Sequence, residues 1–172
     1  PVIVEMILNR QNKYGMTPLM KSAYNGNIEL TRALVNSGVK INIKDNTGSN
    51  ALRYASQEGH TNVVKLLLEN GADFNNKDKK VNSTPLHNAV LYGYKDIVEL
   101  LLNAGANVNI QTTPEKHSAL MFAGASKNRN NDIINMLLNA GADVNSRDKN
   151  GVLAYLYLIH PIDVIKSWGS SG

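Results

Sequence analysis

The side chains with the greatest chemical potential in this chain are its four histidines, and their spacing is unlike that of a catalytic site. They are His60, His87, His117 and His160. No two of them lie four residues apart around a glutamate, which is the pattern of a helical zinc-hydrolase site. The chain has no cysteine, which excludes thiolate catalysis and cysteine-based zinc sites.

The other residue types that support catalysis are not arranged for it either. A serine nucleophile needs a base within reach, and no serine lies in a Gly-x-Ser-x-Gly turn. No glycine-rich phosphate-binding motif is present. We therefore expect no enzyme activity, no metal site and no cofactor.

The elements that would position any site recur along the chain at intervals of 33 to 36 residues. The clearest copy, from Ser83 to Asn109, reads as a turn, a short helix, a glycine turn, a second helix and a glycine-terminated exit. Three rows mark the period: Leu19, Leu52, Leu86 and Leu120; Gly38, Gly71, Gly105 and Gly141; Asn42, Asn75, Asn109 and Asn145. Independent rows that share one period predict a repeat architecture.

This unit resembles the ankyrin repeat, which is a helix–turn–helix of about 33 residues. The resemblance is carried by Thr17-Pro18-Leu19, Thr84-Pro85-Leu86-His87, Gly71-Ala72-Asp73, Gly105-Ala106-Asn107-Val108-Asn109 and Gly141-Ala142-Asp143-Val144-Asn145. It covers nearly the whole chain. It implies an all-α fold, a solenoid of paired antiparallel helices with β-hairpin loops along one edge. Architecture alone does not identify a partner.

The period divides residues 1–172 into a single array. We assign 1–11 to an N-terminal half-repeat or cap, 12–44, 45–77, 78–111 and 112–147 to repeats one to four, 148–168 to a C-terminal capping repeat, and 169–172 to a flexible tail. Residues 3–9 match residues 97–103 in type, so the chain is expected to begin within a second helix. Terminal units of repeat arrays commonly depart from the pattern.

Local signals predict how each unit is held. Thr17 is an expected N-cap with Pro18 at the first helical position, and Asn50 caps the equivalent helix of repeat two. The expected inward face of repeat one is Leu19, Ala23, Leu30 and Leu34. The asparagine row is expected to join neighbouring loops through side-chain to backbone hydrogen bonds.

Repeat four and the end of the chain depart from the common pattern. An insertion at 126–131 lengthens the turn between the two helices of repeat four, and Asp132 is expected to cap the second of them. The insertion is either a tolerated surface change or, through Lys127 and Arg129, an addition to a basic surface. Residues 163–168 are expected to form a short closing helical turn.

The family pattern implies that two of the histidines are structural. His87 ends a Thr-Pro-Leu-His turn, where it is expected to hold its own loop or the next. His60 follows Gly59 in the turn between two helices. His117 lies in a loop and is expected to be exposed.

Composition narrows the class of partner without naming one. The net charge is +4, and the basic residues are scattered without a long run. The apolar runs are too short to span a bilayer, and no signal peptide is visible. We expect a monomer without a membrane span. We expect a cytoplasmic compartment by default, because no signal peptide or membrane span is visible. The assignment stays open because the chain does not begin with methionine.

The resemblance implies that the concave face, made of hairpin tips and first helices, binds a protein or peptide. The expected contact residues are Lys13, Tyr14, Met16, Tyr24, Asn25, Asn46, Thr47, Ser49, Gln57, Glu58, Lys79, Lys80, Ser83, Leu91, Tyr92, Glu115 and His117, with Ala125, Ser126, Lys149 and Asn150 in matching places. Tyr24 and Tyr92 are read as equivalent aromatic anchors, because aromatic residues dominate binding energy. Their alternative role is packing within the array.

Two alternatives to a simple scaffold stay open. The loop lysines could steer an acidic partner, be no more than solvated loop residues, or bind nucleic acid. They are Lys13, Lys79, Lys80, Lys116 and Lys149. The modest charge and the lack of a stacking platform favour a protein partner over nucleic acid. The array could also be a regulatory or targeting arm of a larger protein.

Overall fold

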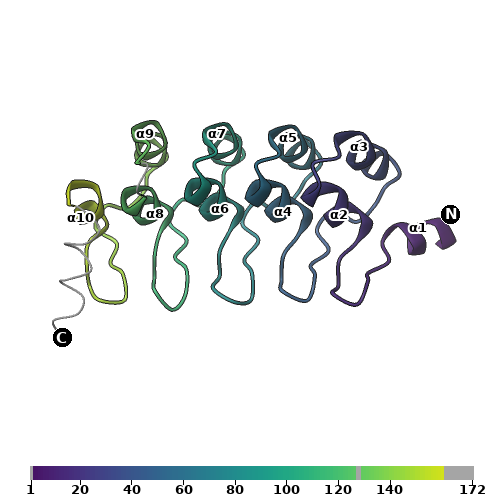
Figure 1. Cartoon of the computed structure of the whole chain (residues 1–172), viewed down its shortest axis with the longest axis horizontal. Helices are drawn as coiled ribbons and strands as arrows, with labels where there is room; N and C mark the ends of the chain where they lie inside the picture. The colour runs from purple at the N-terminus through teal and green to yellow at the C-terminus, as the bar shows by residue number, and fades with distance from the viewer. Residues whose placement is uncertain (1, 127–128, 161–172) are drawn as a thin grey trace.

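The computed structural model describes residues 2–126 and 129–160, which form short helices stacked in chain order (Figure 1). The helices are α1 (Val2–Leu8), α2 (Pro18–Tyr24), α3 (Ile28–Asn36), α4 (Ala51–Glu58), α5 (Thr61–Glu69), α6 (Pro85–Tyr92), α7 (Lys95–Asn103), α8 (Ala119–Ala125), α9 (Asn131–Asn139) and α10 (Ala154–Ile159). First helices α2, α4, α6, α8 and α10 make one row, second helices α3, α5, α7 and α9 lie in a row above them, and the loops extend below (Figure 1). The all-α solenoid of paired helices is confirmed.

Side-chain caps explain why the first helices begin where they do. The Thr17 hydroxyl accepts the amide of Met20, and Pro18 occupies the first turn. Asn50 and Thr84 accept amides in the same way in the next two repeats. Each cap satisfies a backbone donor that the helix leaves unpaired. The predicted caps are confirmed.

The cap of α9 differs from the prediction. The Asn130 side chain accepts the amides of Asp132 and Ile133, and the helix begins at Asn131. Asp132 lies inside the first turn, where a carboxylate still favours the positive end of the helix. The prediction that Asp132 caps this helix is wrong, because the insertion brings an asparagine into the capping position.

The core is one continuous strip of side chains shared by successive repeats. The marker leucines Leu19, Leu52, Leu86 and Leu120 are each at most 1% exposed, so they occupy equivalent environments. A stacked array of this kind buries apolar surface that a single unit leaves in water.

One expected core residue of repeat one lies outside the core. Leu30 is 46% exposed, whereas the next residue, Thr31, is fully buried. Its hydroxyl donates to the Asn27 carbonyl at 2.7 Å and lies 3.1 Å from the Ser22 hydroxyl. Leu30 is uncovered because α3 is the first helix of the upper row (Figure 1). The assignment of Leu30 to the inward face is therefore wrong.

The loops join through their backbones more than through strands. One amide of each loop donates to a carbonyl of the preceding loop, as Asn46 does to Tyr14 (3.1 Å) and Lys79 does to Thr47 (2.8 Å). In residues 2–126 and 129–160, strand-like pairing is limited to two isolated bridges, one in the loop of repeat four and one after it. The expected β-hairpins are therefore tight loops that align with one another but have almost no strand pairing within each loop.

The asparagine row joins successive repeats as predicted. Asn42 accepts the amide of Asp73 at 2.7 Å and donates to the carbonyl of Gly71 at 2.9 Å. Asn109 makes the same two bonds to the following repeat, and Asn75 accepts one amide of its neighbour. These bonds provide partners for backbone groups just after the second helices, and so hold that edge of the array rigid. Across the described part of the chain, no such bond forms from the Asn145 side chain.

The two ends of the array differ from its centre. No side chain of α1 is buried, and α1 lies next to the loop of repeat one, below the level of α3 (Figure 1). At the other end α10 packs on α8. The closing turn expected at 163–168 and the tail at 169–172 lie outside the described residues.

Candidate functional site

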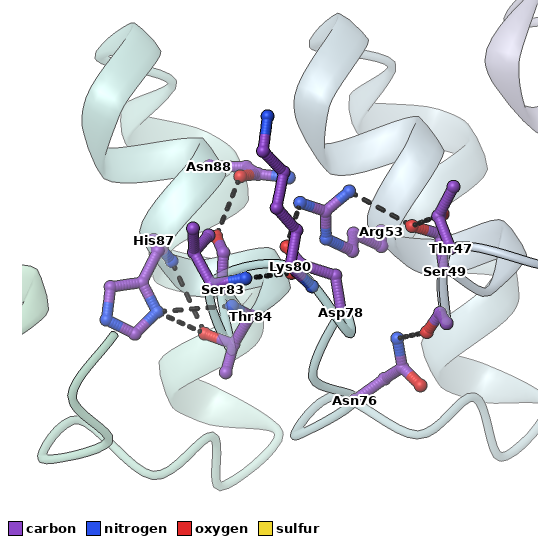
Figure 2. Close-up of polar contacts among 12 residues, drawn as sticks. Thr47, Ser49, Arg53, Asn76, Asp78, Lys80, Ser83, Thr84, His87 and Asn88 are labelled. Atoms are coloured by element: carbon purple, nitrogen blue, oxygen red, sulfur yellow. Dashed lines mark hydrogen bonds and ion pairs between the residues drawn. The ribbon is translucent and has the colours of Figure 1, made fainter. Parts of the chain in front are cut away.

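A buried charge pair holds the loops of repeats two and three together (Figure 2). The guanidinium of Arg53 lies 2.6 Å from the carboxylate of Asp78, and both side chains are largely buried. Arg53 also donates to the Ser49 hydroxyl at 3.1 Å. The amides of Lys80 and Val81 donate to the other oxygen of Asp78. The network therefore orders the backbone of the expected partner-binding loops.

Asp45 plays the same role one repeat earlier. It accepts the amides of Thr47 and Ser49 at 2.9 Å each, and it accepts the hydroxyl of Tyr54. Burial acts to raise the pKa of Asp45, but the hydrogen bonds outweigh it and the pKa is lowered. The carboxylate therefore stays ionised as a loop organiser.

Two residues expected to touch a partner are buried inside these networks. Ser49 is 1% exposed and Ser83 is 7% exposed. The Ser49 hydroxyl accepts from Arg53, and the Ser83 hydroxyl donates to Asn88. The assignment of both serines to the contact surface is wrong, because each one faces its own repeat.

His87 is a buried structural residue, as the family pattern implied. Its Nδ1 lies 2.8 Å from the Thr84 hydroxyl and accepts the Thr84 amide at 3.2 Å. Its ring meets the edge of Phe122 in the next repeat. Burial lowers the pKa of His87 to about 4, against a weaker opposing effect of the backbone of Ile110 and His117. The imidazole is therefore neutral near pH 7.

His117 is partly buried, so the expectation of an exposed loop histidine is wrong. It stands edge-on to Phe122 and Tyr157, with ring centroids 5.7 and 5.9 Å apart. Burial lowers its pKa, while Asp148 and Glu115 act in the opposite direction. The Tyr157 hydroxyl donates to Asp148 at 2.7 Å. This cluster packs α10 against repeat four.

His60 and its counterpart Tyr94 cover the glycine turns of the preceding repeats. The His60 ring lies so close to Gly26 that a Cβ there would meet it at 2.5 Å, and Tyr94 lies the same way against Gly59. His60 Nε2 is also 2.9 Å from the Tyr24 carbonyl. The interpretation of His60 as a turn residue is confirmed.

The remaining expected contact residues reach solvent on the loops and first helices, which we call the loop face. The exposed ones are Lys13, Tyr14, Tyr24, Asn25, Asn46, Thr47, Lys79, Lys80, Leu91 and Tyr92, and the partly exposed ones are Met16, Gln57, Glu58, Glu115 and His117. The backbone bonds between loops place the loop residues of this set side by side. The others lie at or just after the ends of α2, α4 and α6.

Tyr24 and Tyr92 are exposed anchors that are also packed on one side. They are 44% and 54% exposed. The Tyr24 ring meets the edge of Tyr54, and Tyr92 lies against Tyr94. They are not strictly equivalent, since Tyr92 directly precedes its glycine and Tyr24 lies two residues before Gly26. They also belong to α2 and α6, with α4 between them (Figure 1).

The loop lysines do not form one uniform basic row. Lys149 pairs with Glu115 at 2.7 Å, and Lys13 lies over the ring of Tyr14 at 4.9 Å. Lys80 extends away from the Asp78 network (Figure 2). Lys127 lies outside the described residues.

Arg129, from the insertion of repeat four, is tied to the fold. Its guanidinium donates to the carbonyls of Leu158 at 2.5 Å, Tyr157 at 2.8 Å and Gly124 at 3.0 Å. These carbonyls lie at the ends of α8 and α10, where helices leave acceptors unpaired. Arg129 therefore joins two repeats, and its guanidinium is already partly occupied by these carbonyls.

Sequence reasoning missed a groove between α1 and α2. Its volume is about 580 Å³, and it is lined by Ile7, Arg10, Gln11, Asn12, Lys13, Met16, Thr17, Pro18 and Lys21. One difference between the repeats marks the place of this groove in the sequence. Lys21 stands where the other repeats have Tyr54, Asn88 and Phe122.

Among the described residues, no three histidine, cysteine, aspartate or glutamate side chains gather to hold a metal ion. None of the helices described is long and apolar enough to cross a membrane.

The chain is similar to known repeat proteins along most of its length. The family model described as "Ankyrin repeats (3 copies)" matches residues 2–78 and again residues 74–148. An ankyrin repeat protein of fowlpox virus is 31% identical over 114 residues, which are 64% of this chain and 26% of that protein. L-asparaginase of Dirofilaria immitis is 41% identical over 61 residues, which are 36% of this chain and 10% of that enzyme.

A third relative shows the same partial coverage. The ankyrin repeat and KH domain-containing protein mask of Drosophila melanogaster is 36% identical over 89 residues, which are 47% of this chain and 2% of that protein. The chain thus spans about a quarter or less of the length of these relatives.

Proposed function

Because the chain belongs to the ankyrin repeat family, we propose that it is a non-catalytic scaffold that binds a protein or peptide on its loop face. The observation that carries the proposal is a set of large apolar side chains left in water on a rigid surface. Tyr14, Tyr24, Leu91 and Tyr92 are each between 44% and 59% exposed. Exposed apolar groups rimmed by polar ones mark interaction surfaces.

The loops are held in one conformation before a partner arrives, which supports binding without a large entropic cost. Backbone and asparagine bonds join each loop to the next, and Asp45 and Asp78 fix the loop conformations from inside. A partner would therefore meet a preorganised surface, which limits the ordering cost of association.

The test is to replace both tyrosines and measure binding to a partner recovered by affinity capture. Tyr24→Ala with Tyr92→Ala should weaken binding by about tenfold or more, as expected for hot-spot aromatics. Tyr155→Ala, which removes another exposed tyrosine from α10, is the matched control. Circular dichroism should be unchanged in all three proteins. Unchanged affinity in the double variant would show that the binding site is elsewhere.

A second proposal is that the array is a regulatory or targeting arm of a larger protein. It is supported by the curated relatives, in which the matching region is about a quarter or less of the length. Sequencing the complete reading frame tests it, and a frame without any further domain would contradict it. Nucleic-acid binding through the lysines is less favoured, because Lys149 is already paired with Glu115.

A further inference from the structure

The polar residue in the middle of α6, Asn88, departs from a pattern that two other repeats share. Its place, four residues after the residue that precedes the helix, is taken by Tyr54 in α4 and by Tyr157 in α10. Each of these tyrosines donates its hydroxyl to the buried loop aspartate of its own unit, which is Asp45 or Asp148. An asparagine is shorter, so repeat three is built differently at this place.

The exchange leaves hydrogen-bond donors unused in repeat three. The Asn88 oxygen accepts the Ser83 hydroxyl at 3.2 Å, so the amide nitrogen is turned to the other side. Within the described part of the chain, this buried nitrogen has no partner, and neither has Nε of Arg53. Arg53 reaches Asp78 from the preceding repeat through another nitrogen. Because a buried donor without an acceptor costs free energy, an acceptor supplied by a ligand would be favoured here.

A cation extends from the same loop. The amide of Lys80 donates to Asp78 at 2.8 Å, and in the view of Figure 2 its side chain runs past Asn88. Lys80 is exposed, and no ion pair includes it among residues 2–126 and 129–160. The carboxylate of Asp78 is already paired with Arg53 at 2.6 Å. The ammonium of Lys80 is therefore available to an anion.

The charges around Lys80 also favour an anion. Its neighbour Lys79 is exposed as well. Asp45 and Asp78 are only 4% and 5% exposed, so they present little negative charge at the surface. Glu58 is the last residue of α4, at the end away from the loop.

Apolar side chains lie one helical turn further along α6. Leu91 and Tyr92 follow Asn88 by three and four residues, which is the spacing of neighbours on one helix face. They are 50% and 54% exposed. Since α4 packs on one side of α6 and α8 on the other, this place lies inside the array and not at either end of it.

We propose that this face of α6 binds an acidic side chain of the partner, an aspartate or a glutamate. Its carboxylate pairs with the ammonium of Lys80 and accepts the free amide hydrogen of Asn88, while a neighbouring apolar side chain of the partner packs on Leu91 and Tyr92. Because Asn88 is 6% exposed, the exposed Lys80 side chain moves with the entering carboxylate and closes over it. The inference rests on the proposed scaffold function and specifies the chemistry of its ligand.

The test uses a displayed library of short random peptides selected on the chain. The selected sequences should share an aspartate or glutamate next to a large apolar residue. Replacing that acid by its amide should weaken binding by about tenfold, as for a hydrogen bond to a charged group. On the Lys80→Gln variant the same replacement should have much less effect, because the pair is already broken.

A matched control and a second variant keep the result interpretable. Lys65→Gln removes the same charge from an exposed site on α5, in the other row of helices (Figure 1), and the peptide acid should keep its full effect there. Asn88→Asp keeps an acceptor for Ser83 but removes the donor, so it should also weaken binding. Circular dichroism checks the fold of each variant, and Lys80→Gln, at an exposed residue, decides the test if Asn88→Asp is unstable.

Three outcomes would overturn the proposal. The first is a set of selected peptides without acidic enrichment, and the second is a peptide acid whose effect is the same on the natural chain and on Lys80→Gln. The third is random single-stranded DNA that binds and is lost with Lys80→Gln while no acidic peptide is selected, which would assign the cation to phosphates.

The captured partner separates this inference from the scaffold function. Binding that is lost in the Tyr24 and Tyr92 double variant but unchanged in Lys80→Gln would leave the scaffold and remove the acidic site. Binding that neither variant weakens would remove both.

Discussion

The junction between repeats two and three and the junction between α1 and repeat one use basic side chains in opposite ways. In the centre, Arg53 is enclosed between two repeats and paired with Asp78 at 2.6 Å. At the N-terminal end, Arg10 and Lys21 line an open groove that contains no carboxylate. Basic side chains are thus paired with a carboxylate between the two central repeats and line a groove without one beside α1.

The largest effect should come from breaking the central charge pair. Arg53→Ala leaves the buried carboxylate of Asp78 uncompensated, which typically costs about 3–5 kcal/mol of folding free energy. Urea unfolding followed by circular dichroism measures it. Arg10→Ala, at the open end, is the control and should cost less than about 0.5 kcal/mol. Equal costs would mean that the two junctions do not differ as described.

Leucines give the second comparison between centre and end. Leu86→Ala empties a site that is 1% exposed and should cost about 2–5 kcal/mol. Leu30→Ala, at a site that is 46% exposed, should cost less than about 1 kcal/mol, because little buried surface is lost. Chemical denaturation of both variants provides the numbers. A large loss for Leu30→Ala would show that the end of α3 is covered in solution.

The third effect depends on pH and is again central. The pKa of His87 is lowered to about 4 by burial, against a weaker opposing effect of the backbone of Ile110 and His117. Between about pH 6.5, the ordinary pKa of histidine, and pH 4, this side chain is therefore protonated in the unfolded chain but not in the folded one. The stabilisation from this group is complete above that window and is lost as the pH falls through it, by about 3 kcal/mol in all.

His87→Gln should remove that part of the slope. Denaturant unfolding of wild type and variant at several values between pH 4 and pH 7 measures the difference. His117→Gln is the control, because that pKa is lowered by burial in a less enclosed site, and its effect on the slope should be smaller. A slope that survives His87→Gln would place the proton uptake on another group.

The sequence predicted the features that depend on neighbours along the chain. Thr17 and Asn50 cap helices because a cap needs only the next three residues. The marker leucines are buried because every repeat presents them to its neighbours in the same way.

The errors concern features that depend on what lies opposite in space. The period correctly places Ser49 and Ser83 in loops, but it does not show that each one turns toward Arg53 or Asn88. Leu30 lies at a core position of the repeat but lacks the preceding second helix that would cover it. The groove escaped notice for the same reason, since residues of α1, of the loop at 9–15 and of α2 come together there only in space.

The smallest expected effect tests the C-terminal end against the centre. Lys149 and Glu115 lie 2.7 Å apart, as close as Arg53 and Asp78, but their side chains are 46% and 43% exposed. Water screens such a pair, and fixing two mobile side chains offsets most of the attraction, so Lys149→Ala should cost less than about 1 kcal/mol. The measurement is unfolding at low and high salt, where the small loss should shrink further. If Lys149→Ala costs as much as Arg53→Ala, then burial is not what separates the two pairs, and the distinction between a structural centre and open ends would be wrong.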